Sequence, residues 1–407
     1  MIKAYFDNLV KGIENTLANN SSDVISPRKI YALELAHFGS RLYSDTGKIA
    51  WCGLTVPFDL LSAMNITSCF VEFVGAMLSS MGSVNDFIKE AEMDGFPGDL
   101  CSYHRSIIGA TKKEFMPKPD FLIGTTCPCS GGLAVMENLA VHFQKKMFVL
   151  NVPQENSTGH INYLANQLKE MVHFISQQTG ETLVDDKLQQ AIAYTNEARD
   201  IMNQVFTLAQ SKPSPTDSRL LANVGIAYAL LLGTPAAVKI ATQYRNYFNQ
   251  SVIAGQSGVQ NETIRLLWIQ NRIQFKNNII NILEKDHGAV IVADELNDIT
   301  WEPIDPKDPY TSMAKRAISI PFNGKGQRRI NHLKDMAKRY QVHGAINPCN
   351  WGCRQGTGMR GMVEAALKEI DVPVLNLEVD CVDNTNYSEG QLKTRIEAFL
   401  EMLTSRL

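Results

Sequence analysis

The sequence lacks the features that would indicate a membrane protein or a nucleic-acid-binding protein. Its longest apolar stretch, residues 227–238, is too short to span a bilayer and is interrupted by Gly233 and Pro235. The 39 Lys and Arg residues nearly balance the 42 Asp and Glu residues, so the net charge is only −3. Residues 1–16 have the pattern of an amphipathic helix and no unbroken apolar segment, unlike a secretory signal. We therefore expect a cytoplasmic protein that binds neither membranes nor nucleic acids.

A phosphate-binding P-loop is also missing. The segment NGKGQ at residues 323–327 has no Ser or Thr after its Lys and no Gly five positions before Gly324. The segment GTGMRG at residues 356–361 matches the dinucleotide pattern G-x-G-x-x-G. In that motif the first Gly directly follows a strand, whereas here a loop with two cysteines intervenes. These glycines are better explained by their place at the start of a helix, where they let the backbone approach a bound group closely. Because no P-loop is present, any ATP that is used would be hydrolysed by another protein.

Short apolar runs alternate with helical patterns in two parts of the chain. An N-terminal helical arm is predicted for residues 1–45, and strands are predicted within a first α/β domain, residues 46–156, at residues 49–58, 66–71, 121–124 and 147–152. Residues 157–285 have apolar positions with a period near 3.6, including Ile264, Ile273 and Ile282, and we expect a mainly helical segment. In residues 286–407 the alternation returns, with strands expected at 288–295, 342–346 and 372–379. The pattern predicts two parallel-sheet domains of the Rossmann or flavodoxin-like type, with a helical arm and a helical insert.

The eight cysteines are unevenly placed along this pattern. Cys52 and Cys69 lie inside apolar runs, as buried structural thiols do. Five of the other six follow predicted strands, and Cys101 lies upstream of the Cys127/Cys129 pair in DLCSYHR. They form two sets: Cys101, Cys127 and Cys129, and Cys349, Cys353 and Cys381. In parallel sheets the carboxyl ends of the strands lie at one edge, where such folds bind their ligands. The two sets therefore predict a soft metal centre in the cleft between the two domains.

Three interpretations of the six cysteines remain open from the residues alone. Buried structural thiols would explain them poorly, because Cys127-Pro128-Cys129 and the Cys349/Cys353 pair lie in loops. Tetrahedral zinc takes four ligands, and six thiols do not divide into fours. Iron–sulfur clusters take thiolate ligands, and hydrogen bonds from backbone N–H groups to the sulfurs help to set their reduction potentials. Glycines beside the cysteines let such N–H groups come close. We favour the iron–sulfur interpretation.

Two other side chains are candidates for proton transfer. Glu72 ends a predicted strand and precedes a helix, so its carboxylate is either a solvated turn residue or a proton donor in the cleft. His104 lies three residues after Cys101 and is either a surface histidine or a neighbour of the metal centre.

Several segments together resemble the 2-hydroxyacyl-CoA dehydratase and benzoyl-CoA reductase superfamily. They are DLCSYHR, TTCPCSGG, LNVPQENSTGHINYL, RIEAFLEML and PFDLLSAMNITSCFVEF, and the resemblance extends over nearly the whole chain. It implies that Glu72 lies near the substrate. It also implies one [4Fe-4S] cluster in a dehydratase subunit, held by Cys101, Cys353 and either Cys127 or Cys129.

The additional Cys349 and Cys381, and the presence of both Cys127 and Cys129, resemble the double-cubane proteins of the same superfamily. These carry an [8Fe-9S] cluster with three cysteines per cubane. That resemblance implies an anaerobic homodimer that receives electrons from a separate ATP-hydrolysing iron–sulfur reductase and reduces a small molecule.

The sequence thus predicts an iron–sulfur oxidoreductase in which all six loop cysteines hold the cluster and Glu72 and His104 supply protons. One alternative is a 2-hydroxyacyl-CoA dehydratase subunit, a lyase with one [4Fe-4S] cluster. The other is a metal-stabilised scaffold without catalytic activity.

Overall fold

The structure is a computed structural model that describes residues 2–19, 25–222, 224–297 and 301–407. It contains two four-stranded parallel sheets of the same topology, ordered β2-β1-β3-β4 and β6-β5-β7-β8. We call each sheet with its helices the first half and the second half. The strands are β1 (Lys48–Cys52), β2 (Ile66–Phe70), β3 (Phe121–Thr125), β4 (Met147–Leu150), β5 (Ile264–Trp268), β6 (Ala289–Asp294), β7 (Gly344–Pro348) and β8 (Val374–Leu377). The predicted α/β class with two parallel sheets is confirmed.

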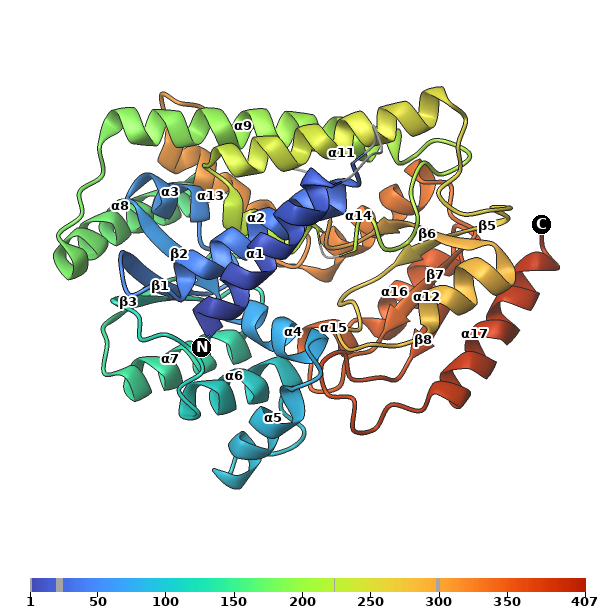
Figure 1. Ribbon diagram of the computed structural model, residues 1–407, viewed down its shortest axis with the longest axis horizontal. Coiled ribbons are helices and arrows are strands. Elements are labelled where there is room, and N and C mark those ends of the chain that lie inside the picture. Colours follow the sequence, from blue (N-terminus) through green and yellow to red (C-terminus); the bar gives the residue numbers. More distant parts are fainter. Residues whose placement is uncertain (1, 20–24, 223, 298–300) are drawn as a thin grey trace.

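Helices cover both sheets and connect them (Figure 1). Those of the first part of the chain are α1 (Ile2–Ala18), α2 (Pro27–Leu42), α3 (Phe58–Ala63), α4 (Glu72–Ser80), α5 (Val84–Met93), α6 (Ser102–Lys112), α7 (Ser130–Phe143), α8 (Thr158–Thr179), α9 (Asp185–Leu208), α10 (Val224–Tyr228) and α11 (Pro235–Ile253). Those of the last part are α12 (Ile279–Asn281), α13 (Pro309–Ser319), α14 (Gly326–Arg339), α15 (Arg354–Thr357), α16 (Arg360–Lys368) and α17 (Glu389–Thr404), with short helical turns at Ala229–Leu231 and Ile282–Asp286.

The inner strands are buried on both faces, which is why they are continuous apolar runs in the sequence. Every residue of β3, β5 and β7 is buried. In the first sheet β1 lies between β2 and β3, and Cys52 is opposite Phe70 on one side and Ile123 on the other. In the second sheet β5 holds the matching place between β6 and β7. The strand order therefore reverses between β1 and β3 and between β5 and β7, and these are the points at which open α/β sheets bind ligands.

One sequence prediction is wrong. Residues 264–282 were expected to form a helix, but Ile264–Trp268 form β5 at the centre of the second sheet. A short run buried on both faces has apolar residues at helical spacings as well as at strand spacings, so the 3.6-residue period was not specific there. Arg265 in this strand is buried and its charge is compensated by Glu262, whose Oε1 is 2.6 Å from Nη1. The domain boundaries themselves stay a prediction.

The long helices α9 and α11 run side by side along one side of the molecule, past both halves (Figure 1). Asp59 of α3 is fully buried and binds Arg316 of α13 with both carboxylate oxygens at 2.8 Å, and Thr195 of α9 also donates to it. These buried contacts of Asp59 hold together α3, α9 and α13, which are distant from one another in sequence. None of the described helices has a stretch both long and apolar enough to cross a membrane.

Candidate functional site: a cavity lined by three thiols

Three of the predicted ligand cysteines lie at helix N-termini. Cys101 immediately precedes α6, Cys129 precedes α7, and Cys353 precedes the short helix α15. The first turn of a helix has backbone N–H groups without intrahelical partners, and these stabilise negative charge on a nearby sulfur. The Cys129 side chain accepts such a bond from the N–H of Gly132 at 3.4 Å.

These three thiols meet at the wall of one cavity of ≈ 570 Å³, together with Glu72 and His104. Cys101 and Cys129 come from the first half and Cys353 from the second, so the cavity lies between the two halves. Much of its remaining wall is apolar and comes from α2, α4 and α10. The structure therefore brings together five of the eight predicted site residues.

The other three cysteines lie around this centre and do not line the cavity. Cys127 lines a neighbouring cavity of ≈ 520 Å³, which shares Pro128, Phe322 and Gln355 with the first cavity. Cys381 is fully buried, with its sulfur 3.8 Å from the carbonyl oxygen of Asn271. Cys349 is buried beside Asn376, at 3.7 Å from the side-chain oxygen.

Electrostatic interactions connect these thiols to one another. Burial raises the pKa of Cys101, and the neighbouring Cys353 and Cys129 raise it further. Burial raises the pKa of Cys381 well above that of a free thiol, and Asp380, Cys353, Cys101 and Cys349 act in the same direction. Burial, with a contribution from Cys129, raises the pKa of Cys127 to about 12. Thiols of the cavity wall and Cys349 thus act in the same direction on the pKa of Cys381.

The raised pKa values have a chemical consequence. Without a positive partner these buried sulfurs hold their protons, because burial disfavours the charged thiolate. A bound metal reverses this preference, because a coordinating thiol is deprotonated. Among the described residues, no three His, Cys, Asp or Glu side chains are grouped so as to hold a single metal ion. The donor set is instead an array of soft sulfur ligands with N–H groups of glycines beside them, which suits an iron–sulfur cluster.

Glu72 and His104 form a pair at the cavity. Glu72 is the first residue of α4, and its Oε1 lies 3.9 Å from His104 Nε2. Its other oxygen, Oε2, is buried and has no hydrogen-bond partner. Gly131 permits this arrangement, because a Cβ at that position would come within 3.0 Å of the His104 ring.

A further group of polar residues at the site was missed by the sequence analysis. Arg329 of α14 is buried and binds Glu295 through Nε at 2.6 Å and Nη2 at 2.8 Å. Glu295 also accepts from the backbone N–H of Gln270, which lines the cavity. The charge of Arg329 opposes the rise in the pKa of Cys353 that burial causes. The sequence signal for this group was the acidic pair Asp294-Glu295 at the end of the apolar run AVIVADE. Glu295 is the first residue after β6.

Fold and site together define an α/β protein with a thiol-lined cavity between two parallel sheets of the same topology. Residues 54–403 match the sequence profile of the family described as 2-hydroxyglutaryl-CoA dehydratase, D-component. Because this match covers most of the chain, the protein belongs to that family.

Individual relatives are distant in sequence but similar in length. The chain is 22% identical over 375 residues to the (R)-phenyllactyl-CoA dehydratase alpha subunit of Clostridium sporogenes, a match that covers 88% of this chain and 90% of the relative. It is 24% identical over 352 residues to a benzoyl-CoA reductase subunit of Thauera aromatica, with 78% and 80% covered. It is 21% identical over 393 residues to the alpha subunit of lactoyl-CoA dehydratase from Anaerotignum propionicum, with 88% and 91% covered. The predicted superfamily is confirmed, and its members include both dehydratases and a reductase.

Proposed function

We propose that this protein is an iron–sulfur oxidoreductase that reduces a small molecule at an [8Fe-9S] double-cubane cluster. The observation that carries the proposal is the meeting of Cys101, Cys129 and Cys353, from both halves, at one cavity wall beside Glu72 and His104. A cluster there would supply low-potential electrons. The names of the relatives, which are acyl-CoA dehydratase and reductase subunits, support this class of activity.

The proposed ligand set is all six loop cysteines. A single cubane needs at most four protein ligands, whereas this chain has six loop cysteines. In addition to burial, these thiols influence one another's pKa values: Cys129 raises that of Cys127, Cys353 raises that of Cys129, and Cys353, Cys101 and Cys349 raise that of Cys381. Arg360 opposes the rise in the pKa of Cys349 that burial causes.

Glu72 and His104 are the proposed proton donors. Both line the cavity, and each electron transferred to a substrate there must be matched by a proton if charge is not to accumulate. His104 lies next to the carboxylate of Glu72, so the pair can hold a proton and pass it to a bound molecule. The largely apolar wall excludes water from the reacting substrate.

The electrons are proposed to come from a separate ATP-hydrolysing iron–sulfur reductase, because the sequence has no P-loop. The active form is proposed to be a homodimer, as the resemblance to the double-cubane proteins implies. One chain carries enough thiols for the whole cluster, so a second kind of cluster-bearing subunit is not needed. The purified protein should hydrolyse no ATP and stay oxidised with ATP alone, and it should be reduced when such a reductase is added with ATP. ATP hydrolysis by the pure chain, followed in a coupled assay, would contradict the proposal.

The second candidate is a 2-hydroxyacyl-CoA dehydratase subunit with one [4Fe-4S] cluster. The specific observation in its favour is that only Cys101, Cys129 and Cys353 line the cavity, which is the number of thiols such a cubane uses in the subunits that this chain resembles. In that case Cys127, Cys349 and Cys381 would be structural. Loss of water from a 2-hydroxyacyl-CoA thioester, measured by mass spectrometry in the presence of the reductase, would favour this candidate.

A further inference from the structure

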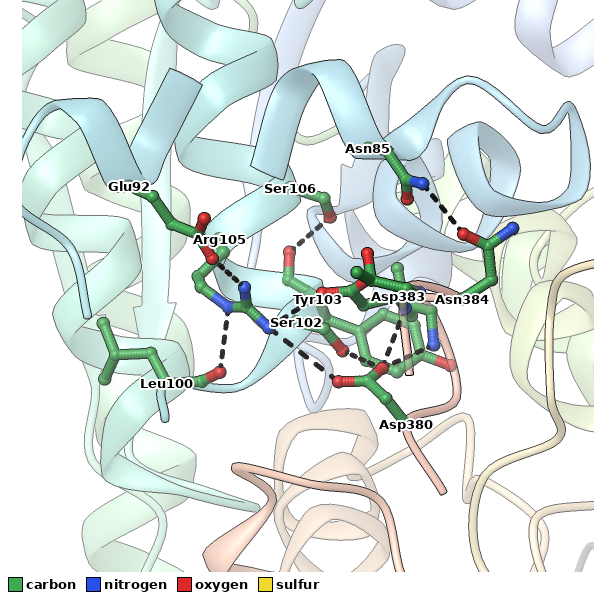
Figure 2. A network of polar contacts seen from close by, with 12 residues as sticks. Asn85, Glu92, Leu100, Ser102, Tyr103, Arg105, Ser106, Asp380, Asp383 and Asn384 are labelled. Carbon is green, nitrogen blue, oxygen red and sulfur yellow. Dashed lines mark hydrogen bonds and ion pairs between the residues drawn. The ribbon is translucent and has the colours of Figure 1, made fainter. Parts of the chain in front are cut away.

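The loop that follows β8 reaches from the second half to the helices of the first (Figure 2). The centre of the contact is Asp380, which is 6% exposed, and Ser102, which is fully buried at the start of α6. Ser102 Oγ donates a hydrogen bond of 2.6 Å to Asp380 Oδ1. The same oxygen accepts from the backbone N–H groups of Val382 at 2.8 Å and Asp383 at 2.9 Å. One carboxylate oxygen thus fixes both the turn of its own loop and the contact with the opposite half.

Arg105, one turn further along α6, supplies the positive charge for this contact. Its Nη2 lies 3.4 Å from Asp383 and 3.9 Å from Asp380, and its Nη1 pairs with Glu92 of α5. Its Nε donates to the carbonyl oxygen of Leu100 at 3.2 Å. The guanidinium is buried and holds the segment before α6 as well as the loop after β8 (Figure 2).

The position of this contact in the sequence relates it to the thiols. Ser102 directly follows Cys101, and Asp380 directly precedes Cys381, so each partner of the 2.6 Å hydrogen bond is one residue from a sulfur. The Cys381 backbone is also held within its own half, because its N–H donates to Asn350 Oδ1 and its carbonyl accepts from the N–H of Gln274, both at 2.8 Å. A side-chain bond at Asp380 therefore fixes a rigidly held sulfur of the second half relative to a sulfur of the first.

We propose that Asp380 is a positioning residue that, through Ser102 and Arg105, sets the placement of Cys381 relative to Cys101 across the two halves. This rests on the proposed function in so far as both sulfurs are cluster ligands. This role explains why a buried carboxylate lies in the loop of Cys381. A contact that served only to hold the two halves together could lie anywhere between them, whereas this one is adjacent in sequence to two cysteines. The rim of the same contact offers a comparison: Asn85 Nδ2 donates to Asn384 Oδ1 at 2.8 Å, in an exposed position away from any sulfur.

The first test uses the full-length, cluster-free, reduced protein, so that it does not depend on the cluster. Cys381 is fully buried in the intact contact, so the measurement is its rate of reaction with a small alkylating reagent, followed by peptide mapping. Ser102→Ala and Asp380→Ala should each raise this rate several-fold, because the loop of Cys381 is no longer held against α6. Asp380→Asn, which keeps the acceptor oxygen, should bring the rate most of the way back to that of the wild type, and Asn85→Ala should leave it unchanged. Equal rates in the wild type, Ser102→Ala and Asp380→Ala would overturn the proposal, as would an equal rise in Asn85→Ala.

The second test uses the iron-loaded protein and stays informative if a variant is too unstable when cluster-free. Ser102→Ala should lower the iron content and change the EPR spectrum of the reduced state, whereas Asn85→Ala should change neither. An unchanged spectrum and full iron content in Ser102→Ala and Asp380→Ala would overturn the positioning role. If the wild type itself bound no iron, the proposed function would fail, while the alkylation rates would still decide whether Asp380 holds the loop of Cys381 in place.

Discussion

At the scale of single residues, the site combines thiols that burial keeps protonated with one carboxylate–imidazole pair. The sequence predicted Cys101, Cys129 and Cys353 as members of two separate cysteine sets, because Cys129 and Cys353 follow predicted strands and Cys101 lies upstream of Cys129. It could not show that these three would share one wall while Cys127, Cys349 and Cys381 would not. Which side of a loop a sulfur faces depends on packing between the halves, and a single sequence carries no pattern for that.

Glu72 and His104 give a prediction at this scale. Glu72→Gln and His104→Gln should each lower the turnover number for substrate reduction by roughly 10²-fold or more, the usual contribution of a positioned proton donor. Iron content and the EPR spectrum should stay as in the wild type, because neither residue is a proposed ligand. Glu90→Gln in α5 serves as the control, because Glu90 pairs with Lys113 at 3.3 Å and is not among the residues that line the cavity. Full activity in both site variants, measured with a chemical reductant, would remove the pair from the mechanism.

Cys52 and Cys69 give a prediction of pH dependence. Both are fully buried in adjacent strands, and burial raises both pKa values above the ordinary thiol value of 9.0. The folded protein therefore keeps protons that the unfolded chain loses above that pH, so the stability that these thiols contribute is present below about pH 9 and is lost as the pH rises. Each thiol should lower the free energy of unfolding by about 1.4 kcal/mol per pH unit above pH 9.

The measurement is urea unfolding at pH 8 and pH 10.5. At pH 8, Cys52→Ala should be less stable than the wild type by about 1–2 kcal/mol, as is usual for a buried truncation. At pH 10.5 this difference should shrink or reverse, because the variant has no buried thiol to ionise. A difference that is independent of pH would contradict the assignment.

At the scale of elements, the loop between Cys349 and Cys353 depends on one glycine. Gly352 has a φ of +73°, and a Cβ there would lie 2.6 Å from the backbone N of Cys101 and the carbonyl carbon of Leu100. The loops that carry Cys101 and Cys353 are therefore in backbone contact, and only Gly permits this approach. The strand predicted at 342–346 corresponds to β7 at Gly344–Pro348, but nothing in the sequence identified the surface against which the following loop would pack.

Gly352→Ala should destabilise the protein by about 1–3 kcal/mol, because it places a side chain in a disfavoured backbone conformation and against a fixed backbone. It should also lower iron retention, because the contact between the two cysteine loops is disturbed. Gly361→Ala, in α16 with open space around its Cα, should be neutral or slightly stabilising and is the matched control. The measurements are thermal unfolding and iron analysis of the two variants. Equal melting temperatures and equal iron contents in Gly352→Ala and Gly361→Ala would contradict the proposed role of the loop contact.

The sheets show where sequence patterns are reliable. The runs at 66–71, 121–124 and 288–295 were predicted as strands because a buried parallel strand is a short apolar run bounded by polar or turn residues. They correspond to β2, β3 and β6. The same rule failed at Ile264–Trp268, because apolar residues continue at helical spacing beyond the strand. The buried ion pair of Arg329 with Glu295 could not be predicted, since its partners are distant in sequence and each resembles an ordinary surface residue.

At the scale of the whole molecule, the two halves have the same strand order and contribute different thiols to a common centre. Two cysteines of the cavity wall belong to one half and one to the other, so a cluster held by all three, as proposed, would link the halves. Iron binding should therefore couple the folding of the two halves, in the way that metal sites stabilise the folded state of the proteins that hold them.

The most direct test of the central claim is the iron and acid-labile sulfide content of anaerobically purified protein and of two variants. A double cubane predicts about eight iron atoms per chain, twice the four of one cubane. Cys349→Ala and Cys381→Ala should each lower the iron content by a large fraction and change the EPR spectrum of the reduced state, while Cys69→Ala changes neither. About four iron atoms in the wild type, with a spectrum unaffected by both substitutions, would contradict the double-cubane account and support a single-cubane dehydratase subunit.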